Sequence, residues 1–452
     1  MRVMAQLAMV INLDRCIGCH HCSVACREER ASRAGFDQPS FSTVETRSGS
    51  GEVLAAERVK PSGGWVRTRQ GKLILNGGGR LKKLGSLFSG SVRPATAEPD
   101  AVADAHADAR AEACADAAAG DPVLAGMSRR VTAEFESAFH FFLPRLCEHC
   151  LNPSCAAACP AGALYKRNDD GIVLVDPAAC SGWQRCVTAC PYAAISFDQA
   201  SGTAQKCDLC AGRIELGLPP ACSESCVGRI RYLGVLLYDA DRVADAARVE
   251  HEHELLDAQR ELFLDPRDPA VIAAARAAEI PDEWIDAAGL TPLWSLIREH
   301  RVALPFHPEY RTLPMVWYIP PLSPIVDVVS GSGGDGEDVE TLLAAIDDLR
   351  APVGYLAGLF TAGDPGPVTH ALRRLAAMRS YRARVALGEP ADESIAERAG
   401  TTGADVEELY RLLADPTGET RHVIPAAFGG QASDLGVPGC GCGTGDGSGT
   451  RP

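Results

Sequence analysis

Fifteen of the 18 cysteines in this chain of 452 residues fall into four tight groups. Gaps of two residues bring successive sulfurs to neighbouring irons of one cluster. A cysteine that follows in a helical turn points to a different cluster, as in two-cluster ferredoxins. This spacing predicts iron–sulfur clusters and electron transfer. In chain order the groups are Cys16-Cys19-Cys22-Cys26, Cys147-Cys150-Cys155-Cys159, Cys180-Cys186-Cys190 and Cys207-Cys210-Cys222-Cys226.

The third group has a tryptophan, Trp183, where a ferredoxin motif would place a cysteine. An indole cannot supply a thiolate, so this group has three thiolates where each of the others has four. Three thiolates match a [3Fe–4S] cluster, and a bulky side chain would exclude water from the vacant position. The count therefore predicts three [4Fe–4S] clusters and one [3Fe–4S] cluster. The alternatives are a [4Fe–4S] cluster with a non-cysteine ligand, and a Trp183 that merely packs at a lost site.

Zinc is another metal that cysteines at short spacings can bind. Zinc sites prefer pairs of cysteines separated by a longer loop. Taken alone, the fourth group could form a zinc ribbon across the interval from Cys210 to Cys222. Beside the other three groups, we expect it to bind a cluster. Disulfide scaffolds are short and secreted, so we expect the thiols of this long chain to stay reduced.

Other residues that could do chemistry are few. We interpret Cys114, Cys440 and Cys442 as non-ligands. His20 and His21 lie inside the first cysteine loop, where they could tune a cluster, although exposed loop histidines are the expected outcome. No Ser/His/Asp set, phosphate loop or pterin-binding pattern stands out. We therefore expect another subunit to handle the substrate.

Charge and hydropathy limit the partners. The net charge of −15 argues against nucleic acid. No run of about 18 apolar residues occurs, so no direct membrane span is expected. The first 14 residues do not read as a signal peptide, because their apolar run is short and a cysteine group follows at once.

Apolar runs lie where strands would position the cysteines. Residues 7–13 lead into the first group, residues 171–175 precede the third group, and residues 195–197 could return after it. Strand, cysteine loop, short helix and strand form the half-unit of a two-cluster ferredoxin. We therefore predict an α+β fold. It comprises two ferredoxin-like units of the bacterial two-cluster type, with a large insertion and a mostly helical and irregular C-terminal extension.

The chain divides into four parts by composition. They are residues 1–45, the first ferredoxin cysteine segment; 46–140, an insertion with an acidic Ala/Asp-rich stretch; 141–240, a ferredoxin-like core with three cysteine groups; and 241–452, an extension for subunit docking.

Segments outside the cysteine groups also carry expectations. Residues 94–121 lack an apolar stripe and predict disorder or a loosely held surface helix. Six prolines in residues 304–325 exclude a regular helix and predict an extended segment lying on a surface. The composition of residues 330–337 predicts a flexible linker. The glycine-rich tail from Gly439 is predicted to be mobile.

Helices are expected in the extension. Residues 241–300 look helical and charged. Further on, apolar residues at helical spacing predict helices that pack in a core. They are Val368, Leu372, Leu375 and Met378, followed by Val406, Leu409 and Leu413.

At its cysteine motifs the chain resembles a known family. It is similar to the iron–sulfur (beta) subunits of the membrane-bound, quinol-dependent respiratory nitrate reductases. The proline-rich segment separates this family from other molybdoenzyme beta subunits. The matching stretches are residues 13–19, 142–153, 222–241 and 307–318.

The resemblance implies which cysteines share a cluster. Fourth cysteines are exchanged between groups in this family. It implies [4Fe–4S] clusters on Cys16, Cys19, Cys22 and Cys226, on Cys26, Cys207, Cys210 and Cys222, and on Cys147, Cys150, Cys155 and Cys190, with a [3Fe–4S] cluster on Cys159, Cys180 and Cys186 and Trp183 at its vacancy.

The resemblance also implies partners. Electrons would pass from quinol through haem b of a membrane gamma subunit to the [3Fe–4S] cluster. The three [4Fe–4S] clusters would then relay them to a molybdopterin alpha subunit that reduces nitrate. The protein would lie at the cytoplasmic face of the cell membrane, peripheral through the gamma subunit.

Some positions depart from the family pattern. Ala193 and Ala194 stand where members usually carry a lysine pair, and residues 27–30, Arg-Glu-Glu-Arg, replace an aromatic-rich stretch. These departures put partner docking and the cluster potentials in question, not cluster assembly.

Other functions remain open from the sequence. A nitrite-oxidising enzyme would use a similar beta subunit in reverse. A stand-alone polyferredoxin or cluster-assembly scaffold would carry the same motifs, but would not need about 200 residues after its last ligand. A zinc-binding structural protein is the third alternative.

Overall fold

A four-stranded sheet joins distant parts of the chain. The computed structural model describes residues 1–34, 40–49, 63–76, 139–326, 339–348, 350–389, 392–414 and 417–425. In the sheet, β1 pairs antiparallel with β10 and parallel with β12, in the order β10-β1-β12-β11. The strands are β1 (Val3–Asn12), β10 (Arg231–Asp239), β11 (Leu304–Pro305) and β12 (Val316–Ile319). The strand predicted at residues 7–13 is confirmed, and it begins earlier.

The proline-rich segment lies in the core, so its predicted position on a surface is wrong. Trp317 and Tyr318 of β12 are completely buried, and almost every residue from 311 to 322 is buried. The segment is extended, as expected, because the prolines flank the short strand and leave its N–H groups free to pair with β1. Apolar and aromatic side chains between the prolines account for the burial.

Short antiparallel strand pairs surround the cysteine loops. The strands predicted at residues 171–175 and 195–197 are confirmed as β7 and β8. The pairs are β2 (Thr43–Gly49) with β5 (Phe139–Arg145), β3 (Trp65–Arg67) with β4 (Leu73–Leu75), β6 (Leu164–Lys166) with β7 (Val173–Val175), and β8 (Ile195–Asp198) with β9 (Thr203–Lys206).

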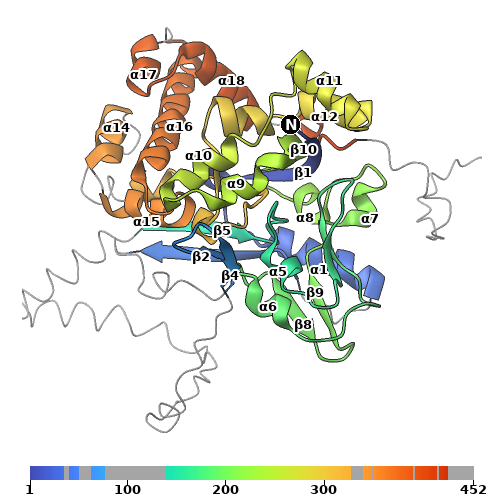
Figure 1. Ribbon diagram of the computed structural model, residues 1–452. Helices are drawn as coiled ribbons and strands as arrows, with labels where there is room; N and C mark the ends of the chain where they lie inside the picture. The colour runs from blue at the N-terminus through green and yellow to red at the C-terminus, as the bar shows by residue number, and fades with distance from the viewer. Residues whose placement is uncertain are drawn as a thin grey trace, which may run out of the picture.

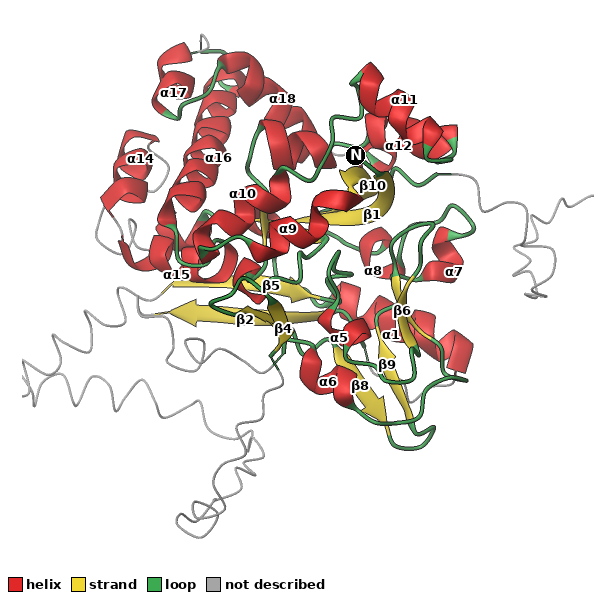
Figure 2. Ribbon diagram, viewed as in Figure 1, coloured by secondary structure: helices red, strands yellow, loops and turns green. Residues whose placement is uncertain are grey.

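The helices form two groups. Figure 2 shows one in the lower right of the view, among the short strand pairs, and a larger one in the upper part. The lower helices are α1 (His21–Ala34), α5 (Ser154–Ala157), α6 (Arg185–Ala189), α7 (Ala211–Ile214) and α8 (Ala221–Glu224).

Several helices of the upper group lie within residues 241–300 and confirm that this segment is largely helical. Short 3-10 turns also occur at Leu13–Arg15, Ala240–Arg242, Glu252–Glu254 and Pro308–Tyr310, with a π turn at Ser295–Glu299. The upper helices are α9 (Val243–Arg248), α10 (Leu255–Arg260), α11 (Pro269–Ala277), α12 (Asp282–Leu290), α14 (Val339–Asp348), α15 (Arg350–Phe360), α16 (Pro365–Ala386), α17 (Glu393–Arg398), α18 (Gly403–Leu413) and α19 (Gly418–Arg421).

Helix α16 is the helix against which several others of the upper group pack (Figure 1). Asp364 caps its first turn by accepting from the Gly366 N–H, with Pro365 at the first helical position. The apolar residues at helical spacing in α16 and α18 are buried, as predicted. Helix α16 packs against α14, α15, α17 and α18.

The α+β class is confirmed, with a ferredoxin-like region below the sheet. The arrangement as two units and the four-part division stay predictions. None of the described helices is long and apolar enough to cross a membrane. The predictions for residues 94–121, residues 330–337, the tail from Gly439 and Cys114, Cys440 and Cys442 lie outside the described residues.

Candidate metal centres

Three cavities are each lined by three or four cysteines. Every one of them takes cysteines from two of the sequence groups, so neighbouring groups exchange their last cysteines in space. The cysteine sets are Cys26, Cys207, Cys210 and Cys222; Cys147, Cys150, Cys155 and Cys190; and Cys159, Cys180 and Cys186 together with Trp183.

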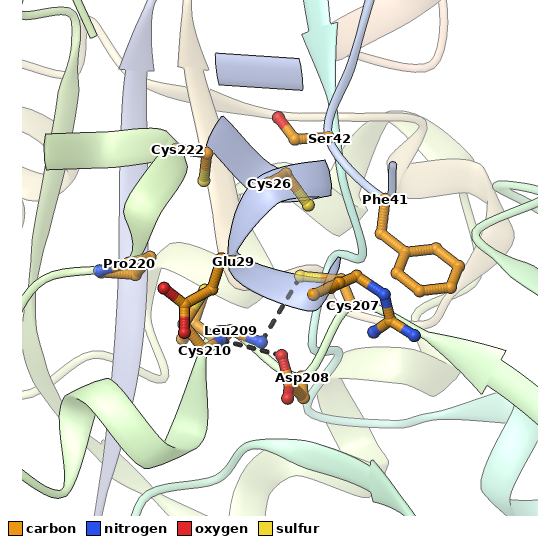
Figure 3. Close-up of a pocket in the computed structure, with 11 residues that line it drawn as sticks. Cys26, Glu29, Phe41, Ser42, Cys207, Asp208, Leu209, Cys210, Pro220 and Cys222 are labelled. Carbon is orange, nitrogen blue, oxygen red and sulfur yellow. Dashed lines mark hydrogen bonds between the residues drawn. The ribbon is translucent and has the colours of Figure 1, made fainter. Parts of the chain in front are cut away.

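The cavity of Cys26 shows how separate elements build one site (Figure 3). Cys26 comes from α1, Cys207 and Cys210 from the loop after β9, and Cys222 from α8. The backbone N–H of Leu209 donates to the Cys207 sulfur over 3.4 Å. Such N–H···S bonds, with sulfurs that face a common space, suit a thiolate-bound cluster.

The remaining four cysteines lie around the first loop. The pKa of Cys16 is raised by burial and by the nearby thiols of Cys22 and Cys226. The chain just after Cys226 passes close to the first loop, because a Cβ at Gly228 would lie only 3.1 Å from the carbonyl oxygen of Arg15. Cys19 lies on the exposed side of the loop. The structure thus brings the fourth group back to the first.

All four cysteine loops share a backbone feature. In each loop, the residue two positions after the first cysteine has a positive φ, in the left-handed region that favours glycine. The residues are Gly18 (67°), His149 (41°), Gly182 (69°) and Leu209 (54°). Two of the four are not glycine, so the turn persists even where it is strained.

The Trp183 loop follows the first loop even more closely. The residues after Cys19 and Trp183 are His20 and Gln184, and their φ values are 56° and 54°. Trp183 therefore occupies the position of a ligand in a loop that keeps the cluster-wrapping turn.

Trp183 lines its cavity but is not packed in a core. Its side chain is 61% exposed, and the Arg185 guanidinium carbon lies 5.4 Å from the ring centroid. This exposure does not support core packing, the first part of the alternative in which Trp183 merely packs at a lost site. The cavity of Cys159, Cys180 and Cys186 thus has an exposed aromatic side chain in its lining.

The buried thiols are poorly suited to ionise without a cation beside them. Burial raises the pKa of Cys210 to about 12 and that of Cys190 to about 11, and neighbouring thiols add to both shifts. A bound iron–sulfur core would favour the thiolate forms, because metal coordination deprotonates thiols. The donor set therefore fits such a group.

Other residues in these loops behave as the sequence predicted. His20 and His21 are exposed. Within the described residues, no group of three or more His, Cys, Asp or Glu side chains is gathered so as to hold a single metal ion.

The residues that depart from the family pattern make contacts or line a hollow in the structure. Arg30 lies over the Phe41 ring at 4.2 Å and donates to Gln205, and Glu29 pairs with Arg213 over 3.5 Å. These contacts fasten α1 to β9 and α7. Ala193 and Ala194 border a surface hollow that Glu45 and Arg145 also line.

Two buried cations near the cysteines went unrecognised in the sequence. Arg231 is 0% exposed and Lys206 is 4% exposed. Arg231 begins β10 and follows another arginine, Arg229, so the sequence does not single it out as buried. Nothing in the sequence around Lys206 marks it as buried.

Comparisons with known proteins agree with this geometry. Residues 138–236 match a family described as a 4Fe-4S dicluster domain, and residues 322–403 match the respiratory nitrate reductase beta C-terminal family. The nitrate reductase beta chain of Bacillus subtilis is 41% identical, over 96% of each chain. The respiratory nitrate reductase 2 beta chain of Escherichia coli is 42% identical, over 98% of this chain and 93% of its own length. The dimethylsulfide dehydrogenase subunit beta of Rhodovulum sulfidophilum is 32% identical, over 79% and 87%.

The cysteine cavities and the dicluster domain define an iron–sulfur electron-transfer protein. The chain belongs to the family of respiratory nitrate reductase beta chains, the electron-transfer subunits of an oxidoreductase.

Proposed function

We propose that the chain carries three [4Fe–4S] clusters and one [3Fe–4S] cluster. The three cysteine-lined cavities carry this proposal, together with the convergence of Cys226 on the first loop. The proposed ligands are Cys16, Cys19, Cys22 and Cys226 at site 1, Cys26, Cys207, Cys210 and Cys222 at site 2, Cys147, Cys150, Cys155 and Cys190 at site 3, and Cys159, Cys180 and Cys186 at site 4, the [3Fe–4S] site beside Trp183.

The four sites form a line. Sites 1 and 2 share the first and fourth groups, and sites 3 and 4 share the second and third groups. Sites 2 and 3 adjoin at Lys206, whose ammonium group donates to the carbonyl of Cys207 in site 2 and to the carbonyl of Val173 in the lining of site 3. An ordered row of redox centres suits a relay between two partners at opposite ends.

The proposed relay runs from site 4 to site 1. Electrons from quinol pass through haem b of a membrane gamma subunit to site 4, then along sites 3, 2 and 1 to a molybdopterin alpha subunit that reduces nitrate to nitrite. The exposed rim of site 4 supports entry there. In this proposal the chain lies at the cytoplasmic face of the membrane, and the gamma subunit holds it there. Residues 241–452 serve subunit docking.

Redox titration followed by electron paramagnetic resonance tests the cluster content. We expect one narrow [3Fe–4S] signal in the oxidised protein and coupled [4Fe–4S] signals on reduction. A colourless protein with zinc and without acid-labile sulfide would overturn the assignment. An oxidised protein without the [3Fe–4S] signal would overturn site 4 alone.

Purification from the native membrane tests the partners. We expect the chain to co-isolate with a molybdenum protein and a haem b protein. A monomer that never co-isolates with a molybdenum protein would instead favour a stand-alone polyferredoxin.

A further inference from the structure

Two buried cations lie between consecutive proposed clusters. Arg231 begins β10, and Lys206 ends β9. Both side chains are withdrawn from solvent, at 0% and 4% exposure. Their positions fall at the two junctions that link sites 1, 2 and 3.

Arg231 lies at the junction of sites 1 and 2. One guanidinium nitrogen, Nη1, donates to the sulfur of Cys222 over 3.3 Å, and Nη2 donates to the Ser42 hydroxyl over 3.0 Å. The thiolates of Cys222, Cys22 and Cys226 all raise its pKa. The guanidinium is therefore hydrogen-bonded to a ligand of site 2, and Arg231 lies five residues after Cys226, a ligand of site 1.

Lys206 lies at the junction of sites 2 and 3. Its ammonium group donates to the Val173 carbonyl and, over 2.6 Å, to the Cys207 carbonyl. The thiolates of Cys147, Cys207 and Cys155 raise its pKa, and Asp208 adds a smaller contribution. The ammonium group thus joins Cys207 of site 2 to Val173, which lines the cavity of site 3.

Across the described residues, neither Arg231 nor Lys206 forms an ion pair with an Asp or Glu, and the Asp208 carboxylate near Lys206 makes only a smaller contribution to its pKa than the cysteines do. A buried charge without a counter-charge is strongly unfavourable. A [4Fe–4S] core with four thiolates has a net negative charge, so the clusters themselves would supply the missing countercharge.

We propose that Arg231 and Lys206 are the built-in counter-charges of the cluster row and raise the midpoint potentials of the clusters that they separate. Reduction adds an electron to a cluster, and a fixed neighbouring cation stabilises that extra negative charge. The Arg231–Cys222 hydrogen bond acts in the same direction. Both residues are positioning residues for electron transfer, and the proposal depends on the cluster assignment given above.

The proposal predicts that Arg231 and Lys206 affect overlapping but different pairs of clusters. Neutralising Arg231 lowers the potentials of sites 1 and 2 and leaves site 3 unchanged. Neutralising Lys206 lowers the potentials of sites 2 and 3 and leaves site 1 unchanged. Site 2 responds to both changes because it lies between the two charges, and site 4 responds to neither.

Redox titration of the complete complex, followed by electron paramagnetic resonance, tests this overlapping pattern. The variants are Arg231→Met and Lys206→Met, with Arg231→Lys and Lys206→Arg to keep the charge. Arg260→Met is the matched control, because Arg260 is a buried arginine that bonds the carbonyls of Arg301 and Ala303. For each neutral variant we expect at least a tenfold fall in the ratio of reduced to oxidised cluster at fixed potential, which is about 59 mV for one electron.

Iron and acid-labile sulfide contents separate this proposal from the cluster assignment. Full cluster content with unshifted potentials in both neutral variants overturns the counter-charge proposal and leaves the assignment standing. Cluster loss in the neutral variants with retention in the charge-keeping variants supports the proposal, since the charge is then required. Equal loss in the neutral and charge-keeping variants overturns it. A wild-type protein without [4Fe–4S] signals overturns the assignment itself.

Discussion

The loop around Trp183 and the loop around Cys19 have the same turn, but they differ in the side chain at the position of a possible cluster ligand. Their third residues, Gly18 and Gly182, have φ values of 67° and 69°. One loop offers a thiol at the next position, and the other offers an indole. The turn is thus the same whether the residue that follows it is a cysteine or a tryptophan.

The two loops also differ in their surroundings. The first is tied to the upper helices, because Arg15 donates to the Leu413 carbonyl over 2.6 Å. The Trp183 loop lies among strand pairs at the surface, with Phe197 and Gly202 as neighbours of Gly182. One end of the proposed row is therefore fastened to the central layers, and the other is open for contact with a partner.

Cys19→Trp copies the Trp183 arrangement into the first loop and should have the largest effect. Site 1 would keep three thiolates, and quinol-dependent nitrate reduction by the complex should fall by more than the ~10–100-fold typical of changes behind the ligands. Steady-state rates and iron content measure this. Ile17→Ala is the control, because Ile17 is 64% exposed beside the same loop. Full activity of Cys19→Trp would show that Cys19 is not a ligand.

Trp183→Cys makes the reverse exchange. The loop already has the required turn, so the cluster should gain about one iron, lose its [3Fe–4S] signal and titrate at a lower potential. Because the indole is 61% exposed, stability should change by only ~0.5 kcal/mol. Electron paramagnetic resonance and iron analysis provide the readout, with Trp183→Phe as the control that keeps three irons. Persistence of the [3Fe–4S] signal in Trp183→Cys would contradict the matched-loop interpretation.

Gly18→Ala and Gly182→Ala compare the tolerance of the two loops. Both positions need a positive φ, which disfavours alanine by roughly 1 kcal/mol or more. A Cβ at Gly18 would also lie 2.5 Å from the Phe142 ring, whereas a Cβ at Gly182 would lie 3.0 Å from the Gly202 carbonyl oxygen. Thermal unfolding should therefore show the larger loss of stability for Gly18→Ala, and equal losses would contradict the packing argument. Gly217→Ala isolates the backbone contribution, because Gly217 has φ 73° and nothing within 4 Å of its Cβ position.

Arg185→Gln should have the smallest effect. The cation–π contact with Trp183 is exposed and contributes only about 0.5 kcal/mol. We expect a small fall in thermal stability and an unchanged [3Fe–4S] signal. A lost signal would show that Arg185 takes a direct part in holding site 4.

The cysteine grouping and the gap at Trp183 were predictable because they are local patterns. Apolar spacing also predicted α16 and α18, since the buried face of a helix repeats within a few residues. The exchange of cysteines between groups came from family resemblance, because spacing alone does not say which distant sulfurs meet.

The central sheet and the buried cations could not be predicted in this way. β12 pairs with β1 across roughly 300 residues, and no local signal shows that the proline-rich segment completes a core sheet. Arg231 and Lys206 are ordinary basic residues in sequence. Only the fold withdraws them from water and places them among cysteines.

The pairing of β1 with β10 brings together cysteines from the two ends of the ferredoxin-like part of the chain. Cys16 follows β1 and Cys226 precedes β10, so the sheet that unites these strands also closes site 1. Sites 3 and 4 have all their cysteines once residue 190 has been synthesised, whereas site 1 must wait for residue 226 and for the strand after it. The first cysteines to leave the ribosome therefore belong to the last site to be completed. In the proposed assignment, a chain that ends before Cys207 has every ligand of sites 3 and 4 and lacks ligands of sites 1 and 2.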